Sequence, residues 1–150
     1  MKTAGDLVKE INRKIVYVTP DYTIFDTVKA MAEADVGGCY VKKDGKIIGR
    51  WTERHLTRDI AKGDIDIKKT PISEVMHTNL YSAQHSASVY NLFDLFLGKR
   101  VRRLLIEKDG EYIGMLYVFD IIKHILQAKN QELKELNSIV SWEYYKRWGN

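Results

Sequence analysis

An internal repeat limits the possible folds of this chain more than any other feature of its sequence. "KKDGKIIG" occupies residues 42–49 and "EKDGEYIG" occupies residues 107–114, so a shift of 65 residues places one stretch on the other. The same shift places Val36 on Val101 and needs no gap from about residue 15 to residue 60. Self-similarity at a fixed period is the signature of a duplicated structural unit. We therefore expect two copies of one unit.

Each copy is predicted to run strand, helix, β-hairpin, helix. The Asp-Gly pairs at 44–45 and 109–110 predict the hairpins, because a tight type I′ turn needs positive φ at both central positions. A helix over about 24–34, and its counterpart over about 89–98, follow from apolar residues at helical spacing: Ile24, Val28 and Met31 in the first copy, Val89, Phe93 and Phe96 in the second. Thr23 and Ser88 are the expected N-caps of these helices.

The predicted fold class is α+β. A βαββα unit this small exposes one face of its sheet, so the tandem repeats are expected to pack sheet to sheet with pseudo-two-fold symmetry, followed by a C-terminal amphipathic helix. The expected division is residues 1–63 for the first repeat with an N-terminal lead-in helix, 64–71 for a linker, 72–127 for the second repeat, and 128–150 for a C-terminal helical extension.

Composition excludes several classes of protein. No apolar run approaches the roughly 18–20 residues of a membrane span, and the N-terminal stretch "MKTAGDLVKEINRK" lacks the apolar core of a signal peptide. The single cysteine, Cys39, offers neither an internal disulfide nor metal-ligand spacing. The sequence also contains no P-loop, HExxH or nucleophile elbow. We expect a cytoplasmic protein with no enzymatic activity, no metal site and no required cofactor.

The order of the elements, together with "VMHTNLYSA" at the opening of the second copy, resembles the CBS domain pair, or Bateman module. The family pattern G-x-x-T/S-x-x-D/N at the start of the last helix corresponds to residues 49–55 and 114–120. The resemblance covers about residues 5–127. It implies a regulatory module that binds an adenosine-containing ligand, such as AMP, ADP, ATP or S-adenosylmethionine, in two clefts between the repeats. It also implies a homodimer and a separate, unidentified effector protein.

The two copies of the motif keep different halves of it. The first has Thr52 but His55 in place of the acid, and the second has Asp120 but Tyr117 in place of the hydroxyl residue. In the family the acid accepts hydrogen bonds from the ribose hydroxyls, which a carboxylate does well. The resemblance therefore implies that the two clefts do not behave alike.

Two sets of ligand residues follow from the resemblance. Cleft one is expected to bind the adenosine ligand through Asp120, Tyr117, Lys14, Ile15, Val16, Val18, Gly37 and Gly38. Cleft two is expected to bind a weaker or phosphate-led ligand, or none, through Thr52, His55, Asn79, Leu80, Tyr81, Arg102 and Arg103. Arginine suits phosphate because its donors form a fixed fork. Each set also has a structural interpretation: helix capping for Asp120 and Thr52, a surface position for His55, close packing for the glycines and a solvated edge for the arginines.

The chain beyond residue 127 has the pattern of an amphipathic helix. Its apolar stripe consists of Leu126, Leu133, Leu136, Val140, Tyr144 and Trp148. The stripe could pack on its own repeats, on a second subunit or on an effector, whereas the near balance of its charges does not favour an anionic membrane.

Two other functions remain open at this point. The half-kept motifs would allow a CBS-pair dimerisation scaffold without a ligand. The net charge of +4 and the basic cluster of Lys99, Arg100, Arg102 and Arg103 would allow nucleic-acid binding, which we rank last because a solvated surface gives the same charge.

Overall fold

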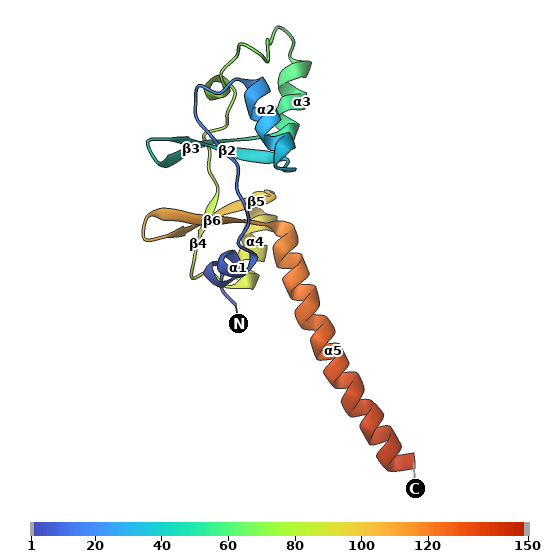
Figure 1. The fold of residues 1–150 in the computed structure, drawn as a ribbon. Helices are drawn as coiled ribbons and strands as arrows, with labels where there is room; N and C mark the ends of the chain where they lie inside the picture. The colour runs from blue at the N-terminus through green and yellow to red at the C-terminus, as the bar shows by residue number, and fades with distance from the viewer. Residues whose placement is uncertain (1, 149–150) are drawn as a thin grey trace. The chain divides into compact units, whose positions relative to one another are not determined.

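The computed structural model describes the chain from residue 2 to residue 148, with side chains described for residues 2–139. The chain divides into two compact units (Figure 1). The central unit is Asn12–Ser82, and the terminal unit combines the N-terminal residues through Ile11 with the chain from Ala83 onward. The α+β class, the two copies and the final helix are confirmed.

The central unit contains one three-stranded sheet in the order β1-β2-β3. Strand β1 runs parallel to β2, which runs antiparallel to β3. The elements of this unit are β1 (Tyr17–Val18), α2 (Ile24–Glu33), β2 (Gly38–Lys43), β3 (Lys46–Thr52), α3 (Glu53–Ala61) and the short 3-10 helix η1 (Ile72–Glu74). The predicted first helix and hairpin are both present.

The terminal unit repeats this plan with a sheet in the order β4-β5-β6. Its elements are α1 (Ala4–Ile11), β4 (Ser82–Gln84), α4 (Val89–Lys99), β5 (Arg103–Lys108), β6 (Glu111–Tyr117) and α5 (Val118–Trp148). Both hairpins turn as predicted, because Asp44 and Gly45 have φ of 51° and 77°, and Asp109 and Gly110 have φ of 52° and 81°. Two successive positive φ values are the requirement of a type I′ turn.

The buried cores of the two units use equivalent positions. Seven buried hydrophobic residues of the central unit each have a buried partner 65 residues later. The pairs are Val18 with Ala83, Ile24 with Val89, Met31 with Phe96, Cys39 with Leu104, Tyr40 with Leu105, Val41 with Ile106, and Trp51 with Leu116. The duplication read from the sequence is therefore a duplication of core packing as well.

The lead-in segments of the two copies are exchanged between the units. Leu7 of α1 and Ile72 of η1 are also 65 residues apart, and both are buried. Helix α1 packs on β6 and β5 in the terminal unit, whereas Ile72 belongs to the central core together with Trp51. Along the sequence α1 precedes the first copy. In space each unit is completed by the segment that precedes the other copy.

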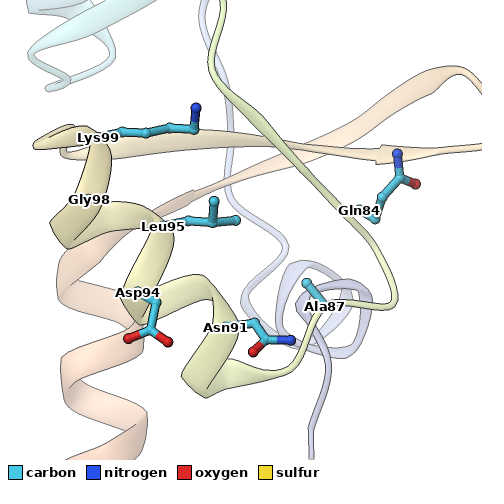
Figure 2. Close-up of a pocket in the computed structure, with 7 residues that line it drawn as sticks. All are labelled: Gln84, Ala87, Asn91, Asp94, Leu95, Gly98 and Lys99. Atoms are coloured by element: carbon cyan, nitrogen blue, oxygen red, sulfur yellow. The ribbon is translucent and has the colours of Figure 1, made fainter.

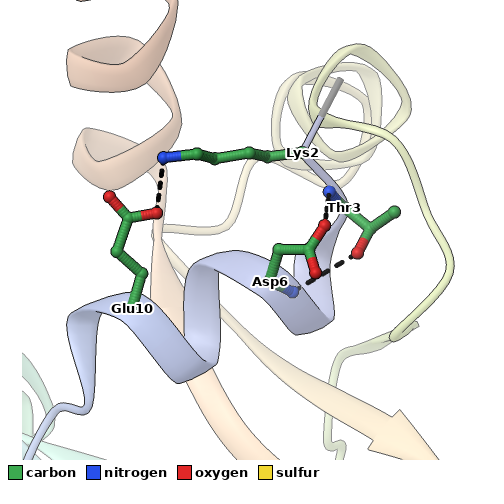
Figure 3. A network of polar contacts seen from close by, with 4 residues as sticks. All are labelled: Lys2, Thr3, Asp6 and Glu10. Atoms are coloured by element: carbon green, nitrogen blue, oxygen red, sulfur yellow. Dashed lines mark hydrogen bonds and ion pairs between the residues drawn. The ribbon is translucent and has the colours of Figure 1, made fainter.

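Hydrogen bonds fix the start of α1 (Figure 3). The Thr3 N–H donates to Oδ2 of Asp6 at 2.9 Å, and the Asp6 N–H donates to Oγ1 of Thr3 at 3.3 Å, which is a reciprocal capping box. The hydrogen bonds from Thr3 lower the pKa of the Asp6 carboxyl. The ion pair between Lys2 and Glu10, at 2.6 Å, is exposed and contributes less than about 1 kcal/mol.

Gly114 of β6 provides a test of how α1 is seated. A Cβ at this position would lie 2.4 Å from Cγ1 of Val8, and the β-branched side chain of Val8 has few other rotamers. Gly114→Ala should therefore lower the free energy of unfolding by about 1–3 kcal/mol in urea denaturation. A Cβ at Gly98 of α4 would meet open space, so Gly98→Ala is the control and should be stabilising by about 0.5–1 kcal/mol. Unchanged stability in Gly114→Ala would contradict this packing of α1 on β6.

Candidate functional site

Helices α3 and α5 begin with the same hydrogen bond, made by different chemical groups. The Thr52 N–H donates to Nδ1 of His55 at 3.1 Å, and the Tyr117 N–H donates to Oδ2 of Asp120 at 2.7 Å. These positions are equivalent in the repeat. An imidazole nitrogen thus accepts the hydrogen bond at the place where the second copy uses a carboxylate. Thr52 and Asp120 therefore make the helix-capping contacts that their structural interpretation predicted.

The terminal unit gathers four of the predicted ligand residues, which we call the Asp120 cluster: Arg102, Arg103, Tyr117 and Asp120. Arg103 pairs with Tyr117 across β5 and β6, and its guanidinium carbon lies 5.1 Å from the centre of the Tyr117 ring. The Val118 N–H donates to the Arg102 carbonyl at 2.9 Å. Nε of Arg103 is buried and has no hydrogen-bond partner in the described part of the chain. A buried donor left unpaired is costly, so this nitrogen is a place where an acceptor would be stabilising.

The central unit gathers the equivalent four residues, which we call the His55 cluster: Gly37, Gly38, Thr52 and His55. Gly38 pairs with Thr52 across β2 and β3, and the Glu53 N–H donates to the Gly37 carbonyl at 3.0 Å. Glycines therefore stand where the Asp120 cluster has arginines, and an imidazole stands where it has a carboxylate. The two clusters share a backbone arrangement and differ in charge.

His77 is a neighbour of His55 that the sequence reasoning missed. The two imidazole rings are stacked, with centroids 3.8 Å apart and an interplanar angle of 12°. The backbone of His77 pairs with that of Arg50 through two hydrogen bonds of 2.8 Å. The ring of His77 thus lies against His55, the residue at the position that Asp120 occupies in the second copy.

Arg50 is the second residue that was missed, and it holds the segment that follows His77. Its Nε donates to the Asn79 carbonyl at 2.9 Å, and its Nη2 donates to Oδ1 of Asn79 at 3.2 Å. Its guanidinium carbon lies 5.2 Å from the centre of the Tyr81 ring, and Nδ2 of Asn79 donates to the Tyr81 hydroxyl at 3.0 Å. The signal in the sequence was the placement of His77, Asn79 and Tyr81 at every second position, a spacing at which side chains share one side of the chain when it is extended.

The remaining predicted residues occupy varied positions in the central unit. Lys14 is exposed, and Ile15, Val16 and Leu80 are half-buried. The side chain of Val18 lies in the hydrophobic core with 2% exposure, so only its backbone could reach a ligand. Each unit thus contains residues from both predicted sets, and the two clefts of the resemblance stay predictions.

The surroundings of both stacked histidines favour the neutral form by lowering the pKa of each ring. Burial, with further contributions from His77 and Arg50, lowers the pKa of His55 to about 4. Burial and Arg50 also lower the pKa of His77. This fits the geometry, because Nδ1 of His55 can accept from the Thr52 N–H only when it carries no proton.

An open depression of about 520 Å³ lies along α4 in the terminal unit (Figure 2). It is lined by Gln84, Ala87, Asn91, Asp94, Leu95, Gly98 and Lys99. None of these residues belongs to either cluster, so the depression is a feature separate from the predicted ligand residues.

The chain belongs to the CBS domain family. The family model described as "CBS domain" matches residues 6–62 and residues 72–127, which agrees with the presence of two copies.

Several relatives share this architecture. The chain is 28% identical over 149 residues to the mitochondrial CBS domain-containing protein CBSX3 of Arabidopsis thaliana, covering 96% of this chain and 71% of that one. The crystal structure of the CBS domain protein NE2398 covers 84% of this chain and 99% of its own at 30% identity, with a TM-score of 0.76. The CBS domain protein PAE2072 of Pyrobaculum aerophilum, solved as a complex with AMP, covers 79% of this chain and 88% of its own at 19% identity and a TM-score of 0.66.

None of the helices in the part of the chain that the structure describes combines the length and the hydropathy that a membrane span requires.

The neutral His55 predicts a dependence of stability on pH. Its pKa is about 4 in the folded chain against 6.5 in the unfolded chain, so on acidification the unfolded chain takes up this proton first. The free energy of unfolding should therefore be highest above pH 6.5 and should fall as the pH drops from about 6.5 toward 4. Urea denaturation across this range measures the slope. His55→Asn keeps an acceptor for the Thr52 N–H without titrating, so this variant should show a smaller slope. An equal slope in both proteins would contradict the assignment.

Proposed function

We propose that this chain is a non-enzymatic regulatory module that binds an adenosine phosphate through the Asp120 cluster and signals to a separate partner protein. The observation that carries the proposal is that the Asp120 carboxylate, the Tyr117 ring and the Arg103 guanidinium lie at one end of the β5–β6 hairpin, next to Arg102 in the chain. These are the groups that a ribose, a base and a phosphate require. The AMP complex of PAE2072 supports the ligand class, since that protein shares the fold.

The capping role of Asp120 is compatible with ribose binding. One carboxylate oxygen accepts from the Tyr117 N–H at 2.7 Å. A carboxylate offers about four acceptor positions in total, so it can serve a backbone N–H and two neighbouring hydroxyls together. The capping bond also fixes the orientation of the carboxylate, which reduces the entropy lost on binding.

The charge of the Asp120 cluster favours a phosphate over S-adenosylmethionine. Arg103 pairs with Tyr117, the backbone carbonyl of Arg102 accepts from the Val118 N–H, and Nε of Arg103 is a buried donor without a partner among the described residues. A phosphate would satisfy such a donor, whereas the sulfonium cation of S-adenosylmethionine would meet like charge. We therefore place Arg103 with Asp120, although the sequence-based prediction grouped it with Thr52.

The His55 cluster is the weaker of the two candidate sites under this proposal. Its neutral imidazole cannot form the charge-assisted bonds that a carboxylate gives to ribose hydroxyls. The stack on His77 and the bond from Thr52 already engage the ring. A homodimer, an effector protein and a cytoplasmic location remain the expectations attached to this function.

A ligand-free dimerisation scaffold is the alternative function, and one observation favours it. Both residues at the acid position, Asp120 and His55, have a capping role that needs no ligand. Under that alternative, removing the Asp120 carboxylate changes only the start of α5.

A thermal melt with AMP, ADP, ATP and S-adenosylmethionine in separate samples tests the proposal. A ligand at 100 times its dissociation constant adds about 2.7 kcal/mol to the free energy of unfolding. For a chain of this length the melting temperature should rise by about 5–10 °C. We expect the rise with at least one adenosine phosphate, and we expect Asp120→Ala to abolish it.

Asp26→Ala is the matched control for this experiment. Asp26 occupies the same N3 position in the capping box of α2 and lies outside both clusters. Each of the two variants should lose up to about 1 kcal/mol of stability from the helix start, while only Asp120→Ala should lose the response to ligand. A response that survives Asp120→Ala would move the site elsewhere, and no response in the wild type would favour the scaffold.

A further inference from the structure

The outer part of α5 exposes apolar side chains that its own unit does not cover. Leu126, Leu133, Leu136 and Ile139 are 57%, 54%, 55% and 56% exposed. Val140, Tyr144 and Trp148, which the sequence analysis placed on the same stripe, lie outside the residues whose side chains are described. Leucine and isoleucine side chains gathered along one helix face are characteristic of a surface that binds a partner.

The spacing of the stripe is that of a coiled coil. Ile122, Leu126, Leu133 and Leu136 are separated by four, seven and three residues, so they fit alternating d and a positions of a heptad. The one polar residue in this register between them is Lys129, at a d position. A seven-residue repeat of this kind over residues 122–136 matches a second helix wound around the first, rather than a flat protein surface.

The charges on α5 select the direction of the second helix. A parallel copy would place Lys129 directly against Lys129 of the partner subunit in the core. An antiparallel copy centred near residue 131 instead places Lys129 within one residue's rise of Glu132 of the partner subunit. Within one chain Nζ of Lys129 already lies 3.3 Å from Oε2 of Glu132. The antiparallel pair thus gathers two lysines and two glutamates into a neutral group.

The same antiparallel register also pairs the apolar residues. About a centre at residue 131, Leu126 falls opposite Leu136 of the partner subunit, and Leu133 falls opposite Lys129 of the partner subunit. Ile125 and Ile139 of the partner subunit, both at g positions, lie on the same side of the seam within two residues' rise of each other. The outer layer of this two-fold symmetric register is therefore apolar, and its central layer holds Lys129 beside Glu132.

We propose that α5 pairs with α5 of a second copy of this chain as an antiparallel two-stranded coiled coil centred near residue 131. This interface does not depend on the adenosine ligand or on the Asp120 cluster.

Disulfide trapping of the full chain distinguishes the two directions. Leu126 lies opposite Leu136 of the partner subunit only in the antiparallel pair, so a mixture of Leu126→Cys chains and Leu136→Cys chains should form a covalent mixed dimer under mild oxidation. Leu126 lies opposite its own copy only in a parallel pair, so Leu126→Cys alone should not cross-link. Cys39 is buried, and burial raises the pKa of its thiol to about 12, so the wild type is the control without cross-links.

A second substitution separates specific pairing from random collision. Leu133→Lys, placed in both cysteine chains, should slow cross-linking by about tenfold or more because it puts a second lysine opposite Lys129 of the partner subunit. Ser138→Lys, on the opposite face of the helix, should leave the rate unchanged. The proposal is overturned if the mixture cross-links no faster than the wild type, if Leu126→Cys alone cross-links as fast as the mixture, or if Leu133→Lys has no effect.

Discussion

The rest of the fold depends on where Leu7 and Ile72 are buried. Leu7 precedes the first copy but packs in the terminal unit, and Ile72 begins the second copy but packs in the central unit. The lead-in helix of the first copy fills the terminal unit, and the lead-in segment of the second copy fills the central core. Neither copy can complete its core from its own contiguous residues. The chain therefore folds as an interdependent pair even though each unit has its own sheet, which is how a repeat too small for independent stability can persist.

The duplicated backbone carries two different chemistries at the same place. In both units a strand pair ends beside the first turn of a helix, and the N3 side chain accepts the N–H of the residue before that helix. Gly37, Gly38 and His55 make this place neutral in the central unit, whereas Arg102, Arg103 and Asp120 make it charged in the terminal unit. Duplication has preserved the hydrogen-bonded frame, and substitution has changed the side chains that surround it.

The sequence predicted most of the fold because its strongest signals are local. Asp-Gly turns and helical periodicity located the hairpins, α2 and α4 without reference to distant residues. The sequence did not predict that Leu7 packs in the terminal unit, because no local pattern encodes a contact between residues so far apart in the chain. Arg50 and His77 were missed for the same reason: their roles arise from pairing between β3 and a segment 27 residues later, and the motif positions drew attention to Thr52 and His55 instead.

Isothermal titration calorimetry of the full chain with AMP tests the unequal chemistry of the two clusters most directly. If the carboxylate and arginines of the Asp120 cluster bind the nucleotide and the neutral His55 cluster does not, the titration should show about one tight site per chain. The binding should weaken as salt is added, because a phosphate held by arginine is screened. Two equal sites per chain, or no heat of binding at any nucleotide concentration that saturates related modules, would contradict the assignment.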